Sequence, residues 1–397
     1  MNVAHFVHRY PPALGGSEAY FARLSEFLVA AGHRVTVFTT TADELSAFWD
    51  RSAQQFAPGI ENRNGVEVRR LPIWHLPVGH RYVLKAFSLV PVAWWQALTA
   101  PFSPVVPALW NVSERFDLVH AAAFPYSFPL ACAGRLARRL GVPFFLTPFV
   151  HTGDPHDSTD AIRRAYTTPA LLELARQADR IFVQTEGERH CLADRGIASD
   201  RLNLQGLGVD TSDCTGGDRG VYGSSLPVIG HLANHSREKG TIDLLEAANI
   251  AWAEGAKFEL LLAGPRMPGF EVWQRSFSPL GRVRMLGPLD RKGKRDFFAA
   301  LDGFALPSRS DSFGLVILEA WANGVPVVVY EAGGPPWIVR DKVDGLVVRC
   351  GDLRALAKTL TCLPNEKQMG EKGRSRLVEF DWPSRLNVVA KAMQETV

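Results

Sequence analysis

Short apolar runs alternate along this chain with longer stretches in which apolar residues recur at helical spacing. The runs predict buried strands, and the stretches between them predict helices. Runs of this kind lie at 3–7, 34–39, 116–120 and 142–148 in the first half, and at 226–232, 258–265, 283–289 and 303–308 in the second. Strands and helices that alternate in both halves predict an α/β protein with two parallel-sheet domains.

A polar segment separates the two halves. Residues 211–225 are rich in Gly, Ser, Thr and Asp and poor in apolar side chains, which is typical of a linker. We therefore expect a first domain at 1–210, a linker at 211–225, and a second domain that begins at 226.

Two of the helical stretches need comment. Residues 163–178 predict one amphipathic helix. Residues 82–109 are apolar and contain Trp94 and Trp95, but prolines at 91, 101, 104 and 107 exclude a continuous membrane-spanning helix. We expect a helix near 81–100 with Arg81 and Lys85 at one end. Two interpretations stay open: the helix packs against its own domain, or it lies on a membrane surface.

The segment from Asp311 to Glu319 is the first candidate site. It follows the predicted strand and turn at 303–308 and enters a predicted helix at 315–323, so both carboxylates lie near the carboxyl end of a strand. The backbone N–H groups of Phe313, Gly314 and Leu315 are expected to hold a phosphate at the helix start. Asp311 is suited to accept hydrogen bonds from sugar hydroxyls, and Glu319 from a ribose.

A second candidate site follows the first strand. Gly15 and Gly16 precede a predicted helix that runs to about residue 31. A glycine pair at a helix start allows close backbone approach to a phosphate or a sugar. The alternative is a flexible turn with Ser17 as the N-cap, and the residues alone leave both open.

These motifs resemble a known family. Residues 307–329 combine Pro-Ser, an acidic residue, Phe-Gly, a second acidic residue eight positions after the first and Gly-Val-Pro-Val-Val, and this resembles the signature of retaining glycosyltransferases of the GT-B fold, family 4. The Gly-Gly-Ser-Glu loop at 15–18 is similar to the start of the same family. One position departs from the signature: Asp311 stands where the family has glutamate.

The resemblance implies roles for further residues. Lys239 matches the lysine that holds the donor diphosphate, with His231 at the family's arginine position and Arg237 as a second candidate cation. His151 is similar to the histidine that contacts the donor sugar or orients the acceptor. Trp337 stands where the family has glutamate. The tail at 376–397, after a second domain at 226–375, resembles the helix that returns to the first domain.

The implied fold is GT-B, two Rossmann-like αβα domains with parallel sheets facing a cleft. The implied activity is that of a hexosyltransferase that moves a sugar, with retention, from a UDP- or GDP-sugar to a hydroxyl acceptor in glycan or glycolipid biosynthesis. No cofactor is expected, because cations and N–H groups stabilise the diphosphate without a metal. Two alternatives stay open: a sugar-nucleotide epimerase of the same fold, and a non-catalytic protein that binds sugar nucleotides or glycans.

Composition narrows the partners. The 397 residues are 46% hydrophobic and 21% charged, as in ordinary globular proteins, and a net charge of +3 does not favour nucleic acid. Five dispersed cysteines indicate reduced thiols, and the N-terminus lacks the pattern of a signal peptide. We expect a cytoplasmic protein with a glycan, lipid-linked or small-molecule acceptor. Contact through 81–110 would place it at the inner face of the membrane.

Overall fold

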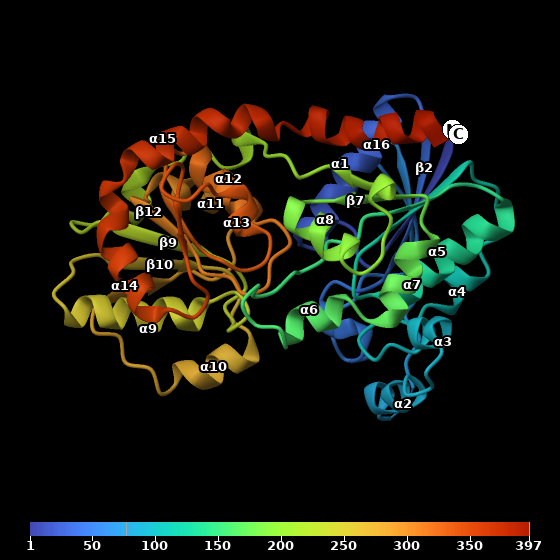
Figure 1. Ribbon diagram of the computed structural model, residues 1–397, viewed down its shortest axis with the longest axis horizontal. Helices are drawn as coiled ribbons and strands as arrows, with labels where there is room; N and C mark the ends of the chain where they lie inside the picture. Colours follow the sequence, from blue (N-terminus) through green and yellow to red (C-terminus); the bar gives the residue numbers. More distant parts are fainter. Residues whose placement is uncertain (77, 397) are drawn as a thin grey trace. The chain divides into compact units, whose positions relative to one another are not determined.

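The computed structural model describes residues 1–76 and 78–396, and the chain forms two compact units, each with its own sheet (Figure 1). The first unit contains Met1–Val150, Arg164–Gln205 and the segment from Pro383 to the C-terminus. The second contains His151–Arg163 and Gly206–Trp382. The α/β class predicted from the alternating apolar runs is confirmed.

The sheet of the first unit has the strand order β3-β4-β2-β1-β5-β6-β7-β8, and all neighbours are parallel except β3 and β4. Helix α1 covers one face of this sheet and α5 and α7 cover the other (Figure 1). Because both faces are buried, the central strands are almost continuously apolar. The strands are β1 (Asn2–Val7), β2 (Arg34–Thr40), β3 (Gly59–Arg63), β4 (Val66–Leu71), β5 (Leu118–Ala122), β6 (Phe144–Leu146), β7 (Arg180–Val183) and β8 (Leu202–Leu204).

The helices of the first unit depart from the expected pattern in two places, and proline is the cause in both. The helix expected near 81–100 is two short helices, α2 (His80–Phe87) and α3 (Ala93–Leu98), separated by a turn that contains Pro91. The single helix expected at 163–178 breaks before Pro169 into α6 (Ala161–Tyr166) and α7 (Pro169–Gln177). The other helices are α1 (Gly16–Ala30), α4 (Pro107–Trp110), α5 (Ser127–Leu140), α8 (Glu186–Ala193) and α16 (Trp382–Thr396).

The sheet of the second unit is entirely parallel, with the order β11-β10-β9-β12-β13-β14. Helices α9 and α14 pack on one face, and α11 and α12 lie on the other (Figure 1). The strands are β9 (Val228–Leu232), β10 (Glu259–Ala263), β11 (Arg282–Met285), β12 (Gly303–Leu306), β13 (Val327–Tyr330) and β14 (Leu346–Val348). The helices are α9 (Thr241–Ala253), α10 (Pro268–Gln274), α11 (Arg291–Ala299), α12 (Leu315–Ala322), α13 (Pro335–Ile338), α14 (Leu353–Cys362) and α15 (Lys367–Ser375).

The strand order places the sites of ligand binding. The second sheet grows in one direction from β9 to β11 and in the other from β12 to β14, so β9 and β12 flank its switch point. The first sheet reverses in the same way between β1 and β5. In open α/β sheets ligands bind outside the carboxyl ends of the strands at such a point. The loops after β1, β9 and β12 are therefore the segments to inspect.

Residues 206–225 pack on the second unit. They form short 3₁₀ turns at Thr211–Asp213 and Arg219–Tyr222. The backbone N–H of Asp218 donates to Asp296 on α11, and Arg219 pairs with Asp302 at 2.8 Å. The polar segment expected as a linker at 211–225 thus has specific partners in the second unit.

Two sequence expectations concern the whole chain. The five cysteines are free thiols and form no disulfide, in agreement with their dispersed positions. Across residues 1–76 and 78–396, no helix has both the length and the hydropathy that crossing a bilayer requires.

Trp321 fills the space between α12 and α15, where it is fully buried and its indole N–H donates to the carbonyl of Asp344 at 3.0 Å. A Cβ on Gly373 of α15 would lie 2.3 Å from the indole ring, so α12 and α15 pack tightly around the Trp321 side chain. Trp321→Ala is expected to lower the free energy of unfolding of the second unit by about 3–5 kcal/mol. Circular dichroism during urea unfolding measures this as a lower midpoint. The control Leu280→Ala, at a side chain that is 65% exposed, should change it by less than about 0.5 kcal/mol.

Candidate functional site

The loop between β9 and α9 carries Lys239 to the carboxyl end of β12. Gly240, the N-cap of α9, has a φ of 72°, and a Cβ there would lie 1.7 Å from the carbonyl oxygen of Pro307. Only glycine permits both the left-handed conformation and this close approach. The Glu238 carbonyl then accepts the backbone N–H groups of Arg309 and Ser310. The two loops are therefore tied together by their backbones.

Lys239 and Asp311 form the central ion pair of the site. The ammonium lies 2.9 Å from Asp311 Oδ2 and donates a second hydrogen bond to the Ser310 carbonyl at 2.8 Å. The Lys239 side chain is 27% exposed and that of Asp311 19%. Burial raises the pKa of Asp311, but the Lys239 charge and the hydrogen bonds from Lys239 and the Phe313 N–H outweigh it and hold this pKa below its usual value. Asp311 is therefore ionised at neutral pH.

His151 belongs to the second unit and lies beside this pair. Its Nδ1 shares a hydrogen bond of 2.6 Å with the Ser310 hydroxyl. Burial and, to a smaller extent, the Lys239 charge lower the pKa of His151 to about 3. The imidazole is neutral at physiological pH. It is thus suited to exchange hydrogen bonds, not to supply a positive charge.

The start of α12 faces the same region. Gly314, its N-cap, has a φ of 90°, and its carbonyl accepts the Ile317 N–H at 2.9 Å. The N–H groups of the first two helical residues have no carbonyl partner within the helix. Leu315 begins this turn. The N–H of Phe313 is not part of the set, because it donates to Asp311 Oδ1 at 3.2 Å. The structure thus retains Gly314 and Leu315 as candidate phosphate donors and gives Phe313 a different contact.

Glu319 lies one turn further into α12. Its carboxylate is 16% exposed and pairs with Lys294 of α11 at 2.6 Å. Burial raises the pKa of Glu319, and the Lys294 charge opposes this shift. Sequence reasoning missed Lys294, because only the packing of α11 against α12 brings it to Glu319. The only indication of this pair in the sequence was the helical spacing of the residues around Lys294.

His231 and Arg237 do not join this cluster. The His231 ring is fully buried in β9, where Nδ1 is bonded to the Ala305 carbonyl and Nε2 to the Thr241 hydroxyl, both at 2.9 Å. Burial lowers its pKa to about 4, so it carries no charge for a diphosphate. Arg237 is exposed on the loop surface. His231 tethers β9 to β12 and α9, which is a structural role.

The loop after β1 in the first unit is held by a buried charge network. Glu18 is 2% exposed and accepts from Arg9 at 2.5 Å, while His8 Nε2 lies 3.5 Å away. Arg9 also donates to the Leu14 carbonyl at 3.1 Å. A Cβ on Gly15 would lie 2.2 Å from Glu18 Oε2, so the glycine is needed for Glu18 to fold back. Gly16 follows as the first residue of α1.

Two family models match the chain. The model for glycosyl transferases group 1 matches residues 226–365, and the model for the glycosyl transferase 4-like domain matches residues 15–208. Together they cover every strand of both sheets except β1. They also include each candidate site residue, from Gly15 to Glu319.

Similar curated proteins are glycosyltransferases. A lipopolysaccharide core biosynthesis glycosyltransferase of Rhizobium meliloti is 29% identical over 223 residues, which are 55% of this chain and 64% of that protein. A D-inositol 3-phosphate glycosyltransferase of Mycolicibacterium gilvum is 27% identical over 366 residues, 87% of this chain and 76% of that protein.

Solved structures share the fold. A sucrose-phosphate synthase from Thermosynechococcus elongatus superimposes with a TM-score of 0.73 at 20% identity and covers 99% of this chain and 98% of its own. HepE from Anabaena, solved with UDP and glucose, gives a TM-score of 0.70 at 18% identity over the whole of both chains. The GT-B architecture expected from the sequence motifs is confirmed.

Glu18 gives a pH prediction for the first unit. Burial raises the pKa of Glu18, but its contacts with His8, Arg9 and Ser17 outweigh burial and lower the pKa to about 2. A carboxyl whose pKa is depressed in the folded state stabilises the fold at every pH above 4.5, its pKa in the unfolded chain. This contribution disappears as the pH falls toward 2. The free energy of unfolding of Glu18→Gln should therefore be lower than that of the wild type by up to about 3 kcal/mol at pH 7. On acidification, the free energy of unfolding of the variant should fall less than that of the wild type. Urea midpoints measured across this pH range would show both effects.

Glu26→Gln, on the same helix, is the matched control and should follow the wild-type pH dependence. A Glu18→Gln variant that differs from the wild type by the same free energy at pH 7 and at pH 2 would contradict the role assigned to the ionised carboxylate.

Proposed function

Because the chain belongs to the group 1 glycosyltransferases and is a hexosyltransferase, we propose that it moves a hexose, with retention, from a nucleoside diphosphate sugar to a hydroxyl acceptor. The observation that carries this proposal is the Lys239–Asp311 pair beside the start of α12, at the switch point of the second sheet. One cation and a set of N–H groups there form a site for an anion. A diphosphate is the anion that fits a sugar donor.

The carboxylates provide acceptors for the rest of the donor. Asp311 is ionised and oriented by Lys239 and the Phe313 N–H, which leaves lone pairs for sugar hydroxyls. Glu319 is oriented by Lys294 in the same way and is suited to the hydroxyls of a ribose. The shorter side chain of Asp311, compared with the family glutamate, sets the reach available for the sugar.

In the proposed mechanism the protein stabilises the departing diphosphate. Lys239 and the N–H groups of Gly314 and Leu315 oppose the charge that develops on the leaving oxygen. These groups are fixed before the reaction, so no reorganisation is needed at the transition state. We propose that the acceptor hydroxyl attacks on the face from which the diphosphate leaves, and that its proton passes to an oxygen of the departing phosphate. This preserves the anomeric configuration without a carboxylate nucleophile and without a metal ion.

His151 and the first unit complete the proposal. As a neutral imidazole, His151 is suited to hydrogen bond a hydroxyl of the transferred sugar. Gly15 and Gly16 stay predicted donor contacts. The acceptor is proposed to be a glycan or a lipid-linked glycan, in a cytoplasmic protein. The UDP and glucose in the HepE structure make UDP-sugars the first donors to test.

The donor class can be tested by thermal stability. A preferred donor present at about 100 times its dissociation constant should stabilise the protein by about 2.7 kcal/mol, because it binds only the folded state. UDP-, GDP- and ADP-sugars are compared by calorimetry with EDTA present, and mass spectrometry then follows nucleotide release. Release that requires an acceptor supports transfer, and epimerisation without release would contradict it. Absence of stabilisation by every donor would contradict the proposed site.

The site can be tested by substitution. Lys239→Ala removes the cation from the leaving group and leaves Asp311 without its partner, so kcat/KM should fall by about 10²- to 10³-fold. Glu319→Ala should raise the KM for the donor by about tenfold or more, because ribose hydroxyls lose an acceptor. Steady-state kinetics with the preferred donor measure both. Lys292→Ala, on the neighbouring helix with a side chain that is 78% exposed, is the control and should act like wild type. Full activity in Lys239→Ala and Glu319→Ala would show that the site is wrongly assigned.

A further inference from the structure

Exposed apolar side chains concentrate in one segment of the first unit. Among the described residues, 21 large hydrophobic side chains are exposed, and 11 of them lie between residues 74 and 110. This segment is less than a tenth of the 397-residue chain. Scattered exposed apolar residues are normal in soluble proteins, but a contiguous group of this size is typical of a surface that binds another protein or a membrane.

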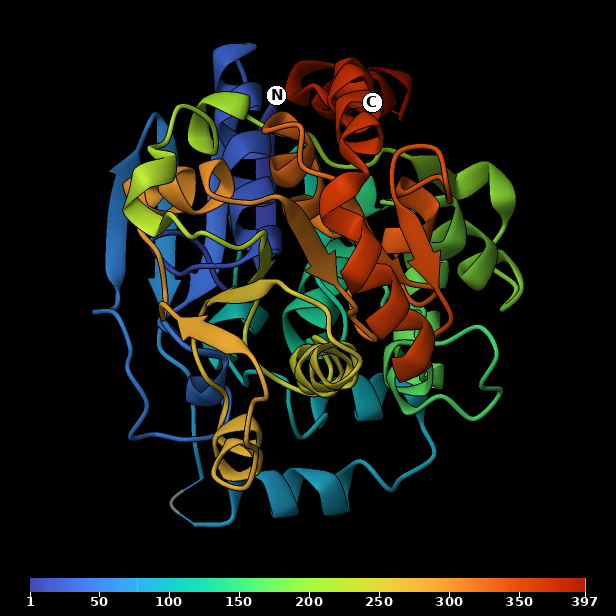
Figure 2. The same ribbon diagram turned by 90° about the vertical axis from the view of Figure 1, so that its left-hand side faces the viewer.

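The group centres on α2, α3 and the turn that joins them. Only His80 and Leu84 of α2 are buried, although the helix also contains Tyr82, which is 82% exposed, and Phe87, which is 50% exposed. In both views α2 projects from the body of its unit (Figures 1 and 2). A helix that buries two side chains and shows its other apolar residues to solvent is not explained by packing within its own domain.

The turn between these helices is the most apolar part of this surface. Leu89 is 76% exposed, and Val90 and Val92 flank Pro91. Trp94, at the start of α3, is 61% exposed. The indole of Trp95 fixes the turn, since its N–H donates to the Phe87 carbonyl at 2.8 Å. We call residues 78–94 the apolar platform.

The charge of this region has one sign. Residues 68–113 include no aspartate or glutamate, whereas Arg81 and Lys85 extend from α2 itself. Arg81 lies over the Phe102 ring at 4.4 Å, so its cation stays next to the apolar side chains. Arg135 of α5 lies in the same way over Trp110 at 4.3 Å. Cations interleaved with exposed tryptophan, tyrosine and aliphatic tips match the polar–apolar boundary of an anionic bilayer.

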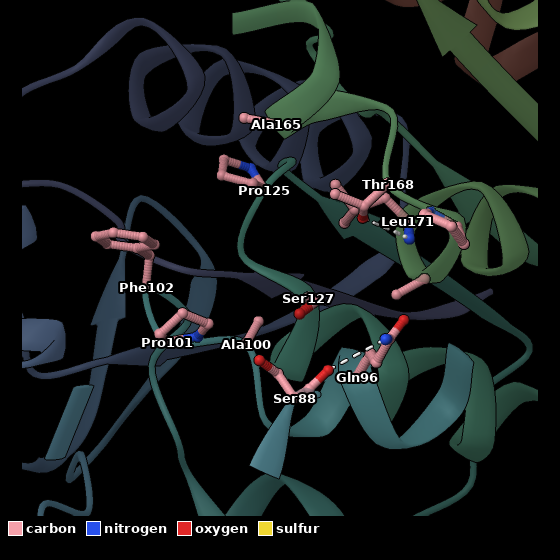
Figure 3. A pocket seen from close by; sticks show the side chains of 12 residues that line it. Ser88, Gln96, Ala100, Pro101, Phe102, Pro125, Ser127, Ala165, Thr168 and Leu171 are labelled. Atoms are coloured by element: carbon pink, nitrogen blue, oxygen red, sulfur yellow. Dashed lines mark hydrogen bonds between the residues drawn. The ribbon is translucent and has the colours of Figure 1, made fainter. Parts of the chain in front are cut away.

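A cavity lies behind the platform. It has a volume of about 400 Å³ and is lined mostly by apolar groups (Figure 3). Ser88 and Gln96 line it from the side of α2 and α3, and Leu171 of α7 and its N-cap Thr168 line it from the other side. The Gln96 amide donates to the Ser88 carbonyl at 3.1 Å and so ties α3 to the end of α2. The platform is therefore braced as one piece and is not a loose loop.

We propose that the apolar platform docks on the surface of an anionic lipid bilayer. Leu89, Val90 and Trp94 enter the headgroup boundary, and Arg81 and Lys85 meet the lipid phosphates. This docking goes beyond the proposed sugar transfer and does not depend on it. It would give the first unit direct access to an acceptor that is dissolved in the membrane.

The test is flotation of the purified full chain with vesicles of phosphatidylcholine mixed with phosphatidylglycerol, compared with phosphatidylcholine alone. Binding is expected on the anionic vesicles, with weaker binding on the neutral ones and at high salt. The double variant Leu89→Glu/Trp94→Glu should lower the partition coefficient at least about tenfold. Lys85→Glu should lower it by a similar factor on anionic vesicles only.

Two variants of the second unit are matched controls. Leu280→Glu changes a side chain that is 65% exposed, and Lys358→Glu changes an exposed lysine on α14; both should bind vesicles like the wild type. All variants should keep the wild-type circular dichroism melt and the donor stabilisation described above, which separates docking from transfer.

Equal vesicle binding by the double variant and the wild type would overturn the proposal, as would no binding of the wild type to anionic vesicles. A wild-type dimer that becomes monomeric in the double variant would also overturn it, since the platform would then be an interface between two copies of the chain.

Discussion

The ion pair between Lys239 and Asp311 is the contact on which the candidate site depends. It joins the loop after β9 to the loop after β12, the two strands at the switch point of the second sheet. Its geometry requires Gly240, because any Cβ there would collide with the Pro307 carbonyl. The cation is held in advance by Asp311 and the Ser310 carbonyl, so a diphosphate meets a charge whose position is already fixed.

In the first unit a different set of contacts fixes the loop at the candidate site. Its glycine loop is fixed by Glu18, a buried carboxylate that Arg9 and His8 keep ionised. In both units a carboxylate on the loop or helix after a central strand orients a cation from a neighbouring loop or strand end. Such pairs cost desolvation, but they fix a loop in one arrangement, and a site that binds anions needs that rigidity.

In the second unit, two neutral histidines have structural and hydrogen-bonding roles. His231 stands where the family has arginine, yet it is buried and both ring nitrogens are bonded to groups on β12 and α9. His151 is also neutral, because burial and the nearby ammonium disfavour a second positive charge. The positive charge of the cluster around Asp311 therefore comes from Lys239. The imidazoles contribute directed hydrogen bonds and no charge.

The sequence by itself determined the strand and helix alternation, the family, and the residues at strand ends, since apolar period and glycine-rich loops are local signals. Helix breaks at Pro91 and Pro169 were readable in principle, but the apolar spacing across them concealed the breaks. Only the tertiary structure decided that Phe313 donates to Asp311, that Lys294 pairs with Glu319, and that His231 is buried. These contacts join residues whose proximity or orientation depends on how loops and helices pack. No local pattern in the chain encodes that packing.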